Sequence, residues 1–594
     1  MRPTRSTTSK RLRYGVAAVA VLTLGVASAC SSSPSSSSST SPSASGSASA
    51  TSGTTTQYPR NETLYTSGTL YGPATTWNPL NTGNYATGAQ GLIYEPLYLY
   101  DPVKNTYDPW LATGAEASGW QGNTFVINVR SGVKWTDGQP LTGADVAFSI
   151  NLARTDTADP YNENVASVAN ATANGNTVTV TFKGTPGYTQ FADYLWKAPV
   201  LPQHLWSKIP ASQIETYADS HPVGTGPMTL LTANSQETVY QTNPSWWGTS
   251  ALGLSFKFKY LVDVINGSNS QELGQLTAGN IDWSNNYLPG INQLATAQQG
   301  QGGYTLKFYY PKAPYMMSGN TVWLEPNTTK APMNNVNFRR ALAYALNPSA
   351  IAQAVYGGIA APSNPVGLLP NLVSAGYLNQ SVVSQYAATY NPAKAKQLAA
   401  AAGYHGQTLT LMAPQGWSDW NTAQQVIQQE LQQAGINVQI VEPTANQRTA
   451  DITNGNYDLA LDNNAILDTT PWSYFQRVYQ LPIQSQQTAQ LNWERINEPA
   501  DWNLVQQAAS VQPSNTTALN QIYSTLEKDF LQQQPEIPLW YNGVWFQGNT
   551  QYWQDFPSST GSDQYVPAMW RGYLGAMTTV YALAQLQPAP KTSS

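Results

Sequence analysis

The chain has 594 residues, of which 41% are hydrophobic and only 10% are charged, and its net charge is −5 at pH 7. Without a basic tract it lacks the clustered Lys and Arg that bind nucleic acid, so we expect no nucleic-acid partner. The single cysteine excludes intrachain disulfides and thiolate metal sites. The length exceeds what one hydrophobic core supports, which predicts two or three lobes.

The first predicted element is an export signal. Five basic residues from Arg2 to Arg13 precede an apolar run, 14–27, and small residues that end at Ala29. A basic start, a short apolar run and small residues before the cleavage point predict a secretory signal peptide over 1–29. The run is shorter than the roughly 20 residues of a membrane span. Because the segment carries five basic residues and no acidic one, the net charge without it is −10.

The next feature is Cys30. The sequence Ala27-Ser28-Ala29-Cys30 resembles a bacterial lipobox, in which the cysteine is lipid-modified, although Ala27 stands where that pattern prefers Leu. Residues 31–56 are almost entirely Ser, Thr, Ala, Pro and Gly, a composition that stays a solvated coil and spans about 25–30 Å on average. We expect lipidation at Cys30, a tether over 30–56 and a location on the outer face of the cell membrane, in the periplasmic or cell-wall space. An ordinary cleavage site that precedes a cysteine is the alternative.

Strand and helix patterns interleave through the remaining chain. Alternating apolar and polar residues predict strands, the second of them after an Asn-Gly turn, at 125–129, 177–182 and 255–260. Periodic apolar residues with Asn-Pro or Gly at the ends predict helices at 338–346, 393–402 and 422–434. Residues 436–441 read as a buried strand. The order predicts a mixed α/β class, and no second apolar run reaches the length of a membrane span.

A series of collinear segments resembles the family 5 extracellular solute-binding proteins, the peptide/nickel class of ABC-importer receptors. The opening pair contains Tyr94-Glu95-Pro96-Leu97 and Trp110-Leu111-Ala112, and the most diagnostic stretch runs from Val129 through Asp137-Gly138 to Val146. Further segments in the family's order are 201–206, 223–227, 243–248, 279–282, 336–346, 391–404 and 457–459. Each segment is weak alone, and their common order carries the resemblance.

The resemblance implies a bilobed fold of the periplasmic-binding-protein type (type II, cluster C), with an additional inserted domain and two lobes joined by a hinge. Lobe one would comprise 57–92, 223–325 and 536–594, the inserted domain 93–222, and the other lobe 326–535. Family membership also implies a receptor that holds its ligand in an interlobe cleft and delivers it to the permease subunits of an ABC importer in the membrane. We expect a monomer without a cofactor.

The ligand class remains open between an oligopeptide and an oligosaccharide. Peptide carriers of the family hold the ligand's amine with an aspartate in a segment resembling D-N-x-D-P, by a charge-assisted bond. Here Asp468 and Pro471 fit that segment, but its second aspartate is absent. The segments 364–368, 416–420 and 470–474 instead resemble the oligosaccharide-binding branch.

Sugar rings present apolar faces that indoles cover and hydroxyl edges that amides and carboxylates bind. The candidate stacking residues are Trp417, Trp420, Trp472 and Tyr474, and the candidate edge partners are Asp419, Asn463, Asn464 and Asp468. The alternative for two or three of the aromatic residues is a place in the core, because buried Trp is common.

The sequence argues against an enzyme. His204, His221 and His405 are the only histidines, and none has a partner at metal-ligand spacing. No G-x-S-x-G motif or phosphate-binding glycine loop stands out. We therefore expect neither a metal site nor catalysis. The alternative is a surface-anchored carbohydrate-active hydrolase, which needs only two positioned carboxylates.

Overall fold

The computed structural model describes residues 58–68, 72–81, 86–297, 305–464, 467–483, 491–561, 564–568 and 578–590. The chain divides into a unit over 1–55 and a unit over 56–594, and all of the described residues belong to the second. The predicted signal peptide, Cys30 and the tether lie outside the described residues. Within the described segments, no helix combines the length and the hydropathy that a membrane crossing requires.

The first large sheet has seven strands in the order β13-β19-β12-β1-β11-β10-β9. These are β1 (Thr63–Ser67), β9 (Met228–Ala233), β10 (Glu237–Thr242), β11 (Tyr260–Val264), β12 (Trp283–Ser284), β13 (Leu306–Lys307) and β19 (Gln547–Asn549). Strands β11 and β12 pair with β1 in parallel, whereas β9, β10 and β19 run antiparallel to their neighbours. The associated helices are α4 (Trp247–Leu252), α5 (Asn269–Thr277), α6 (Ile291–Ala297) and α17 (Thr579–Gln585).

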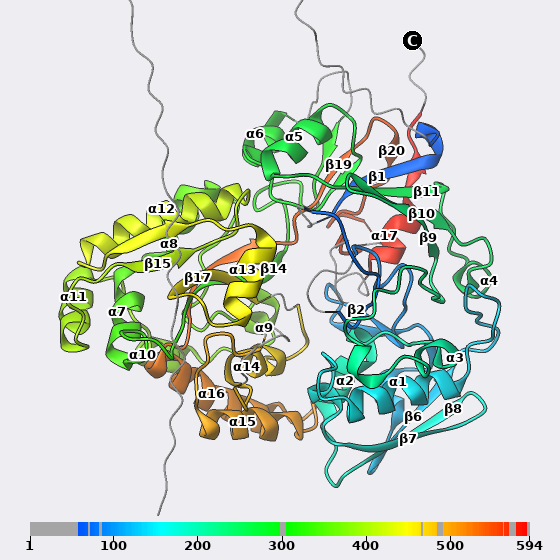
Figure 1. Cartoon of the computed structure of the whole chain (residues 1–594), viewed down its shortest axis with the longest axis horizontal. Coiled ribbons are helices and arrows are strands. Elements are labelled where there is room, and N and C mark those ends of the chain that lie inside the picture. Colours follow the sequence, from blue (N-terminus) through cyan, green and yellow to red (C-terminus); the bar gives the residue numbers. More distant parts are fainter. Residues whose placement is uncertain are drawn as a thin grey trace, which may run out of the picture. The chain divides into compact units, whose positions relative to one another are not determined.

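A second body of structure lies between β1 and β9 in sequence. Its antiparallel sheet contains β4 (Ala112–Thr113), β5 (Trp120–Gln121), β6 (Thr124–Val129), β7 (Val168–Asn174) and β8 (Thr177–Phe182). Helix α1 (Gly143–Thr155) packs along β7 and β8 (Figure 1). The hairpin of β2 (Tyr98–Asp101) and β3 (Thr106–Pro109) and helices α2 (Tyr188–Lys197) and α3 (Gln203–Trp206) complete it. The strands predicted at 125–129 and 177–182 are confirmed.

The second large sheet has the order β16-β15-β17-β14-β18. Its strands are β14 (Ser318–Pro326), β15 (Leu409–Met412), β16 (Val438–Val441), β17 (Leu459–Asn464) and β18 (Ile537–Gly543). Strands β15, β16 and β17 are parallel, and β14 is antiparallel to both β17 and β18. Helix α12 (Ser418–Gln433) packs on β16, and α8 (Pro348–Tyr356) packs on β18 and on α12 (Figure 1).

The helices associated with the second sheet are α7 (Val336–Ala345), α8 (Pro348–Tyr356), α9 (Pro370–Ser374), α10 (Gln380–Tyr386), α11 (Pro392–Ala401), α12 (Ser418–Gln433), α13 (Ala445–Thr453), α14 (Trp472–Tyr479), α15 (Pro499–Ala509) and α16 (Thr516–Gln533). Two further short strands, β20 (Trp553–Gln554) and β21 (Gln587–Pro588), pair with each other. The helices predicted at 338–346, 393–402 and 422–434 are confirmed as α7, α11 and α12.

Two predicted strands are corrected. Residues 255–259 form no strand, because Phe256 and Phe258 pack against Trp246 and Trp553 without sheet pairing, and β11 begins only at Tyr260. The strand predicted at 436–441 exists as β16, but it is not a buried strand. It lies at the edge of the sheet, where only Val438 is buried.

Strand pairing bears on the expected lobe boundaries, which remain a prediction. Both β14 and β18 pair entirely within the second sheet, whereas boundaries at 325/326 and 535/536 would assign most of both strands to the first lobe. We therefore propose that the lobes meet at about residues 317 and 544, in the segments that lead from β13 to β14 and from β18 to β19.

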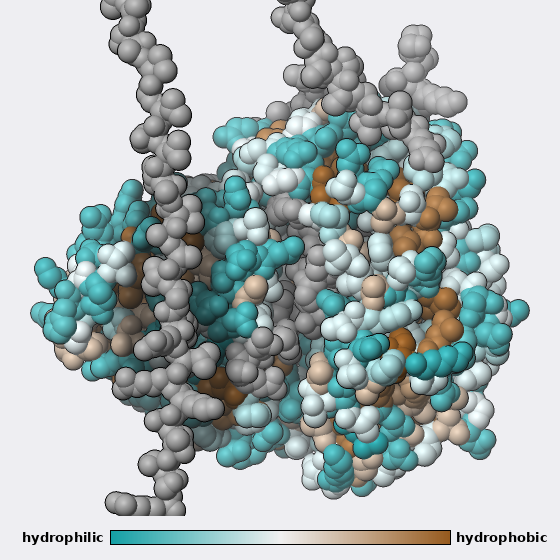
Figure 2. Space-filling model, in the orientation of Figure 1, coloured by the Kyte–Doolittle hydropathy of each residue, from teal (hydrophilic) through white to brown (hydrophobic). Residues whose placement is uncertain are grey.

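Many of the abundant tryptophan side chains are buried in the protein interior. Nine of the 19 tryptophans rank among the largest fully buried side chains, and the face shown in Figure 2 is mostly hydrophilic with small, separate hydrophobic patches. The Glu95 carboxylate, which is 0% exposed, accepts hydrogen bonds from the indoles of Trp110 (3.0 Å), Trp246 (3.1 Å) and Trp247 (2.8 Å) and from the Thr225 hydroxyl (2.7 Å). Burial raises the pKa of Glu95 to about 7. Several of the family-like segments therefore converge on one buried carboxylate.

Candidate functional site

Ligands of open α/β sheets bind outside the carboxyl ends of the parallel strands. In the first sheet, β1, β11 and β12 end at Ser67, Val264 and Ser284, and in the second sheet β15 and β17 end at Met412 and Asn464. The candidate ligand residues from 417 to 474 all lie at or after the ends of β15 and β17. The sequence pattern therefore selected the expected edge of the second sheet.

The structure brings the loops after β11 and β15 together. The backbone N–H of Asn269 donates to the carbonyl of Gly416 (3.4 Å), and its side-chain Nδ2 lies 3.3 Å from Ser418 Oγ and 3.4 Å from Asp419 Oδ1. Gly416 has φ +86°, and a Cβ atom there would lie 3.0 Å from the Gly267 carbonyl oxygen. We call this meeting point of the two sheets, 265–269 and 284–287 with 413–419, 462–464 and 467–468, the strand-end site.

The first sheet contributes a dense polar cluster to the strand-end site. Glu272 accepts hydrogen bonds from Ser284 Oγ and from Asn286 Nδ2 (2.6 Å), and burial raises its pKa to about 7. Asn266 donates to Ser67 Oγ (2.9 Å), while its Oδ1 is buried without a hydrogen-bond partner among the described residues. These residues were not predicted. The polar residues that follow β11 and β12 were the sequence signal that could have indicated this cluster. However, β12 has only two residues, and the strand predicted at 255–260 ended where β11 begins.

Asp419 and Trp420 are inside the protein. The Asp419 carboxylate accepts a hydrogen bond from the Tyr356 hydroxyl (2.8 Å), and burial raises its pKa to about 6. Trp420 is 1% exposed and packs edge-on against Trp417, with ring centroids 4.7 Å apart. Trp417 itself is half-buried at the start of α12.

The other predicted residues follow β17. Asn463 is half-buried and pairs with Val322 of β14, and the side chain of Asn464, the last residue of the strand, lies outside the described part of the structure. Trp472 (0% exposed) and Tyr474 (5% exposed) point into a hydrophobic core, where the Tyr474 hydroxyl lies within hydrogen-bond distance of Val366 O and of Glu536 Oε1.

A ring that is enclosed by the core has no face for a ligand in this conformation. The proposed stacking role of Trp420, Trp472 and Tyr474 is therefore corrected to a structural one, because all three are packed in the core. Trp417 is the stacking candidate that the structure retains.

Asp468 is already paired within the protein. Its Oδ2 lies 2.8 Å from the Lys197 ammonium at the end of α2, and it also accepts from Ser473 Oγ. Its Oδ1 accepts from the Thr469 backbone N–H (2.6 Å). Asp468 is 1% exposed. Lys197 is separated from Asp468 by 271 positions, and no local sequence signal connects the two residues.

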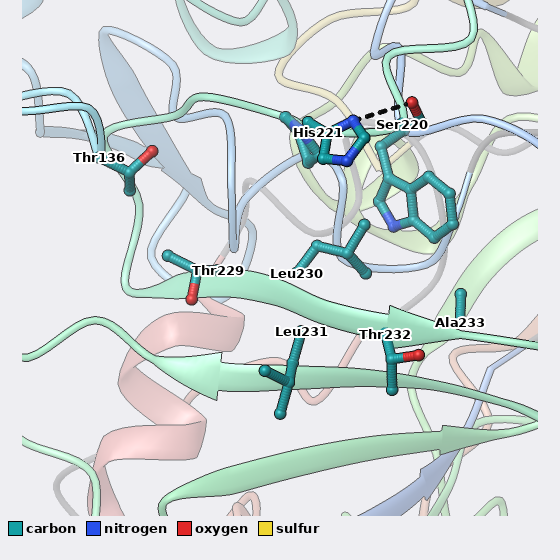
Figure 3. A pocket seen from close by; sticks show the side chains of 10 residues that line it. Thr136, Ser220, His221, Thr229, Leu230, Leu231, Thr232 and Ala233 are labelled. Atoms are coloured by element: carbon teal, nitrogen blue, oxygen red, sulfur yellow. Dashed lines mark hydrogen bonds between the residues drawn. The ribbon is translucent and has the colours of Figure 1, made fainter.

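A separate pocket lies beside the edge strand β9 (Figure 3). Its volume is about 410 Å³, and it is bounded by Trp77, Thr136, Ser220, His221, Pro222 and residues 229–233. The Ser220 hydroxyl lies 3.1 Å from His221 Nδ1. None of the predicted ligand residues lines this pocket, so it is not part of the strand-end site. Among the described residues, no group of three His, Cys, Asp or Glu side chains could hold a metal ion.

Comparisons with known proteins agree with this architecture. The family model of the bacterial extracellular solute-binding proteins, family 5 Middle, matches residues 106–485. The peptide transport periplasmic protein SapA of Salmonella typhimurium is 25% identical over 531 residues, which cover 82% of this chain and 89% of that protein.

Two solved structures extend the comparison. The mannohexaose-bound periplasmic oligopeptide-binding protein of Thermotoga maritima is 31% identical, with a TM-score of 0.83 over 89% of this chain and 99% of that one. The oligopeptide-binding protein AppA of Bacillus subtilis, in complex with a nonapeptide, shares the fold at 18% identity, with a TM-score of 0.71 over 89% of this chain and 99% of that one. These similarities confirm the predicted fold class, a mixed α/β protein of the periplasmic-binding type.

Proposed function

Because the chain belongs to the bacterial extracellular solute-binding proteins of family 5, we propose that it captures an oligosaccharide between its two large sheets and delivers it to the permease subunits of an ABC importer. Capture involves no bond breaking. A ligand that contacts the strand ends of both sheets favours the closed form. It shifts the equilibrium between the open and closed forms only by the difference between its affinities for the two.

One observation carries the choice of an oligosaccharide: the carboxylates of the strand-end site are all bonded within the protein. Asp419 and Asp468 each accept hydrogen bonds from neighbouring protein groups, and Asp462 is paired with Arg448 (3.0 Å). Behind them, Glu272 accepts from Asn286 and Asp263 accepts from Gly68 N–H (2.7 Å). Among the described residues of the site, an ammonium group would find no acid without a protein partner. The remaining side chains are hydroxyls, amides and an indole, and these suit the hydroxyl edges and apolar faces of sugar rings.

The mannohexaose in the structure of the Thermotoga protein supports the same ligand class. We therefore propose Trp417 as a stacking residue, with Asn266 and Asn463 as partners for hydroxyl groups. Asn266 supports this role because its buried Oδ1 has no hydrogen-bond partner among the described residues, and buried polar atoms normally have one.

The second candidate ligand is an oligopeptide. The names of the relatives favour it: SapA is a peptide transport protein and AppA holds a nonapeptide. In that case Asp468 would bind the amine of the peptide, and Lys197 would have to leave it. Asp468→Ala should then abolish peptide binding, whereas it should only weaken the binding of a sugar.

A thermal-shift panel separates the two ligand classes. Mannohexaose, cellohexaose and di- to pentapeptides are added to the mature protein, and a ligand at 100 times its Kd should stabilise the folded state by about 2.7 kcal/mol. Stabilisation by peptides alone would contradict the oligosaccharide proposal. Incubation with labelled oligosaccharides tests the hydrolase alternative, since recovery of unchanged ligand supports binding without catalysis and cleavage products would refute it.

The cellular location follows from the same proposal. A receptor of an ABC importer works beside its permease, and we propose that the lipid on Cys30 and the tether 30–56 keep it there. The protein would then act as a monomer on the outer face of the cell membrane. Membrane attachment of the exported chain is the property to measure.

A further inference from the structure

Lys197 is an unusual lysine, because it is buried between two carboxylates from different parts of the chain. Its ammonium lies 2.7 Å from Asp193 Oδ2, 2.8 Å from Asp468 Oδ2 and 3.0 Å from Ser473 Oγ, and its side chain is 8% exposed. An ammonium has three N–H donors and no acceptor, and each of these three oxygen atoms can accept a hydrogen bond from it. Buried lysines are rare unless they are paired in this way.

We propose that Lys197 determines the ligand specificity of this receptor: its ammonium occupies, from within the protein, the place on Asp468 that the charged amine of a ligand would take. The inference rests on the proposed function and deepens it, because it names the residue that excludes free-amine peptides from the strand-end site.

The contacts of Asp468 leave no room for a second cation. Oδ2 accepts from Lys197 and contacts the Ser473 hydroxyl, whose single O–H is shared with Asp193 Oδ2 (2.7 Å), and Oδ1 accepts from Thr469 N–H. The same loop is fixed further by Asn371, whose Nδ2 donates to the Asp468 carbonyl (2.9 Å), and by the Tyr107 and Thr469 hydroxyls, which lie 3.2 Å apart. A ligand ammonium would therefore have to displace Lys197 from Asp468 and leave the buried lysine with Asp193 as its one remaining carboxylate partner among the described residues, which is unfavourable.

The lysine reaches Asp468 from the inserted domain. Asp193 and Lys197 are four residues apart on α2 and therefore lie on one face of the helix. Asp193 is 0% exposed, and its pKa is raised to about 7 by burial and by the charge of Asp468. Burial and the negative charge of Asp468 raise the pKa of the phenols of Tyr100, Tyr107, Tyr377 and Tyr523. Two acids beside one base thus leave an excess of negative charge that would attract an amine if Lys197 were absent.

The test compares a free-amine peptide with its blocked form. Trialanine and N-acetyl-trialanine are titrated into the wild-type protein and into Lys197→Met, which keeps the length of the side chain and removes its charge. The matched control is Lys197→Arg, which keeps the charge. A second variant, Lys197→Met with Asp193→Asn, removes the excess carboxylate so that loss of the lysine does not leave two unpaired acids. Circular dichroism verifies the folding of each.

We expect the wild type and Lys197→Arg to bind neither peptide measurably. The Lys197→Met variants should bind trialanine at least tenfold more tightly than N-acetyl-trialanine. The proposal is overturned if the wild type binds trialanine and loses it on acetylation, because the amine site would then be open with Lys197 in place. It is also overturned if the folded Lys197→Met variants do not distinguish the two peptides.

These outcomes are separable from those of the proposed function. If the wild type binds mannohexaose and the variants show no preference for the free amine, the specificity role of Lys197 fails and the oligosaccharide function stands. If the wild type binds no oligosaccharide but the variants prefer the free amine, the proposed ligand class fails and the role of Lys197 stands. The wild-type comparison of the two peptides requires no variant, so it decides the matter even where a substitution prevents folding.

Discussion

The turn 224–227 allows a direct test of how tightly the body of structure between β1 and β9 joins the first sheet. A Cβ atom at Gly224 would lie 1.9 Å from the Ile93 carbonyl oxygen, whereas ordinary contacts begin at 3.4 Å, so Gly224→Ala must separate the two backbone segments by about 1.5 Å. Three hydrogen bonds resist that separation: Gly226 N–H to Ile93 O (2.9 Å), Met228 N–H to Leu92 O (3.0 Å) and Thr136 N–H to Gly224 O (2.9 Å).

Overpacking of this kind costs about 1–3 kcal/mol, and each lost hydrogen bond costs about 1 kcal/mol more. We expect Gly224→Ala to lower the free energy of unfolding by about 4 kcal/mol. The measurement is urea denaturation followed by tryptophan fluorescence and circular dichroism. The matched control is Gly274→Ala at an exposed position of helix α5, where a Cβ would meet no heavy atom within 4 Å.

In the control, alanine replaces glycine inside a helix, so its stability should rise by about 0.5–1 kcal/mol. Replacing glycine by alanine is thus expected to lower the free energy of unfolding at position 224 and to raise it at position 274. A Gly224→Ala protein within about 1 kcal/mol of the wild type would refute the reasoning that the close approach is rigid.

Three further predictions concern the ligand, pH and the anchor. Trp417→Ala should weaken mannohexaose binding about tenfold in calorimetric titration. Trp420→Ala, in the core, should instead lower the free energy of unfolding by about 3–5 kcal/mol. If both variants lost the same affinity and neither lost stability, the assignment of Trp417 to the ligand and Trp420 to the core would be contradicted. Since burial raises the pKa of Glu95 from 4.5 to about 7, its folded form holds the proton more tightly, so stability should fall by up to about 3 kcal/mol as the pH rises from 4.5 through 7. Urea denaturation at pH 5 and 8 should show a smaller fall in Glu95→Gln, and an unchanged fall would exclude Glu95 as the cause. Cys30→Ala should appear in the medium instead of the membrane fraction, and a variant that stays membrane-bound would rule out the lipid anchor.

Much of the fold was predictable because its signals are local. Helices α7, α11 and α12 have apolar periodicity and end at Ala345, Ala401 and Gln433, close to the Asn-Pro or Gly that the sequence marks. The strand predicted at 255–260 failed because alternation reports which side chains are buried and not whether the backbone pairs. Phe256 and Phe258 find aromatic neighbours instead of a partner strand.

Only the part of the candidate site that belongs to the second sheet was predictable from the sequence. The segments after β15 and β17 carry tryptophans and acids that stand out in a charge-poor chain, and the structure does place them at the carboxyl ends of parallel strands. Whether an aromatic ring faces a ligand or the core depends on elements distant in sequence. Tyr474, for example, packs near Trp323 and donates to Glu536.

The sequence by itself determined the family and the mixed α/β class, since those properties reside in motifs and patterns that can be read locally. Only the tertiary structure decided which acids remain open to a ligand. Asp468 matched the amine-binding aspartate of peptide carriers in sequence, yet α2 brings Lys197 to 2.8 Å from it. A buried carboxylate requires a partner, and that partner came from a residue 271 positions away.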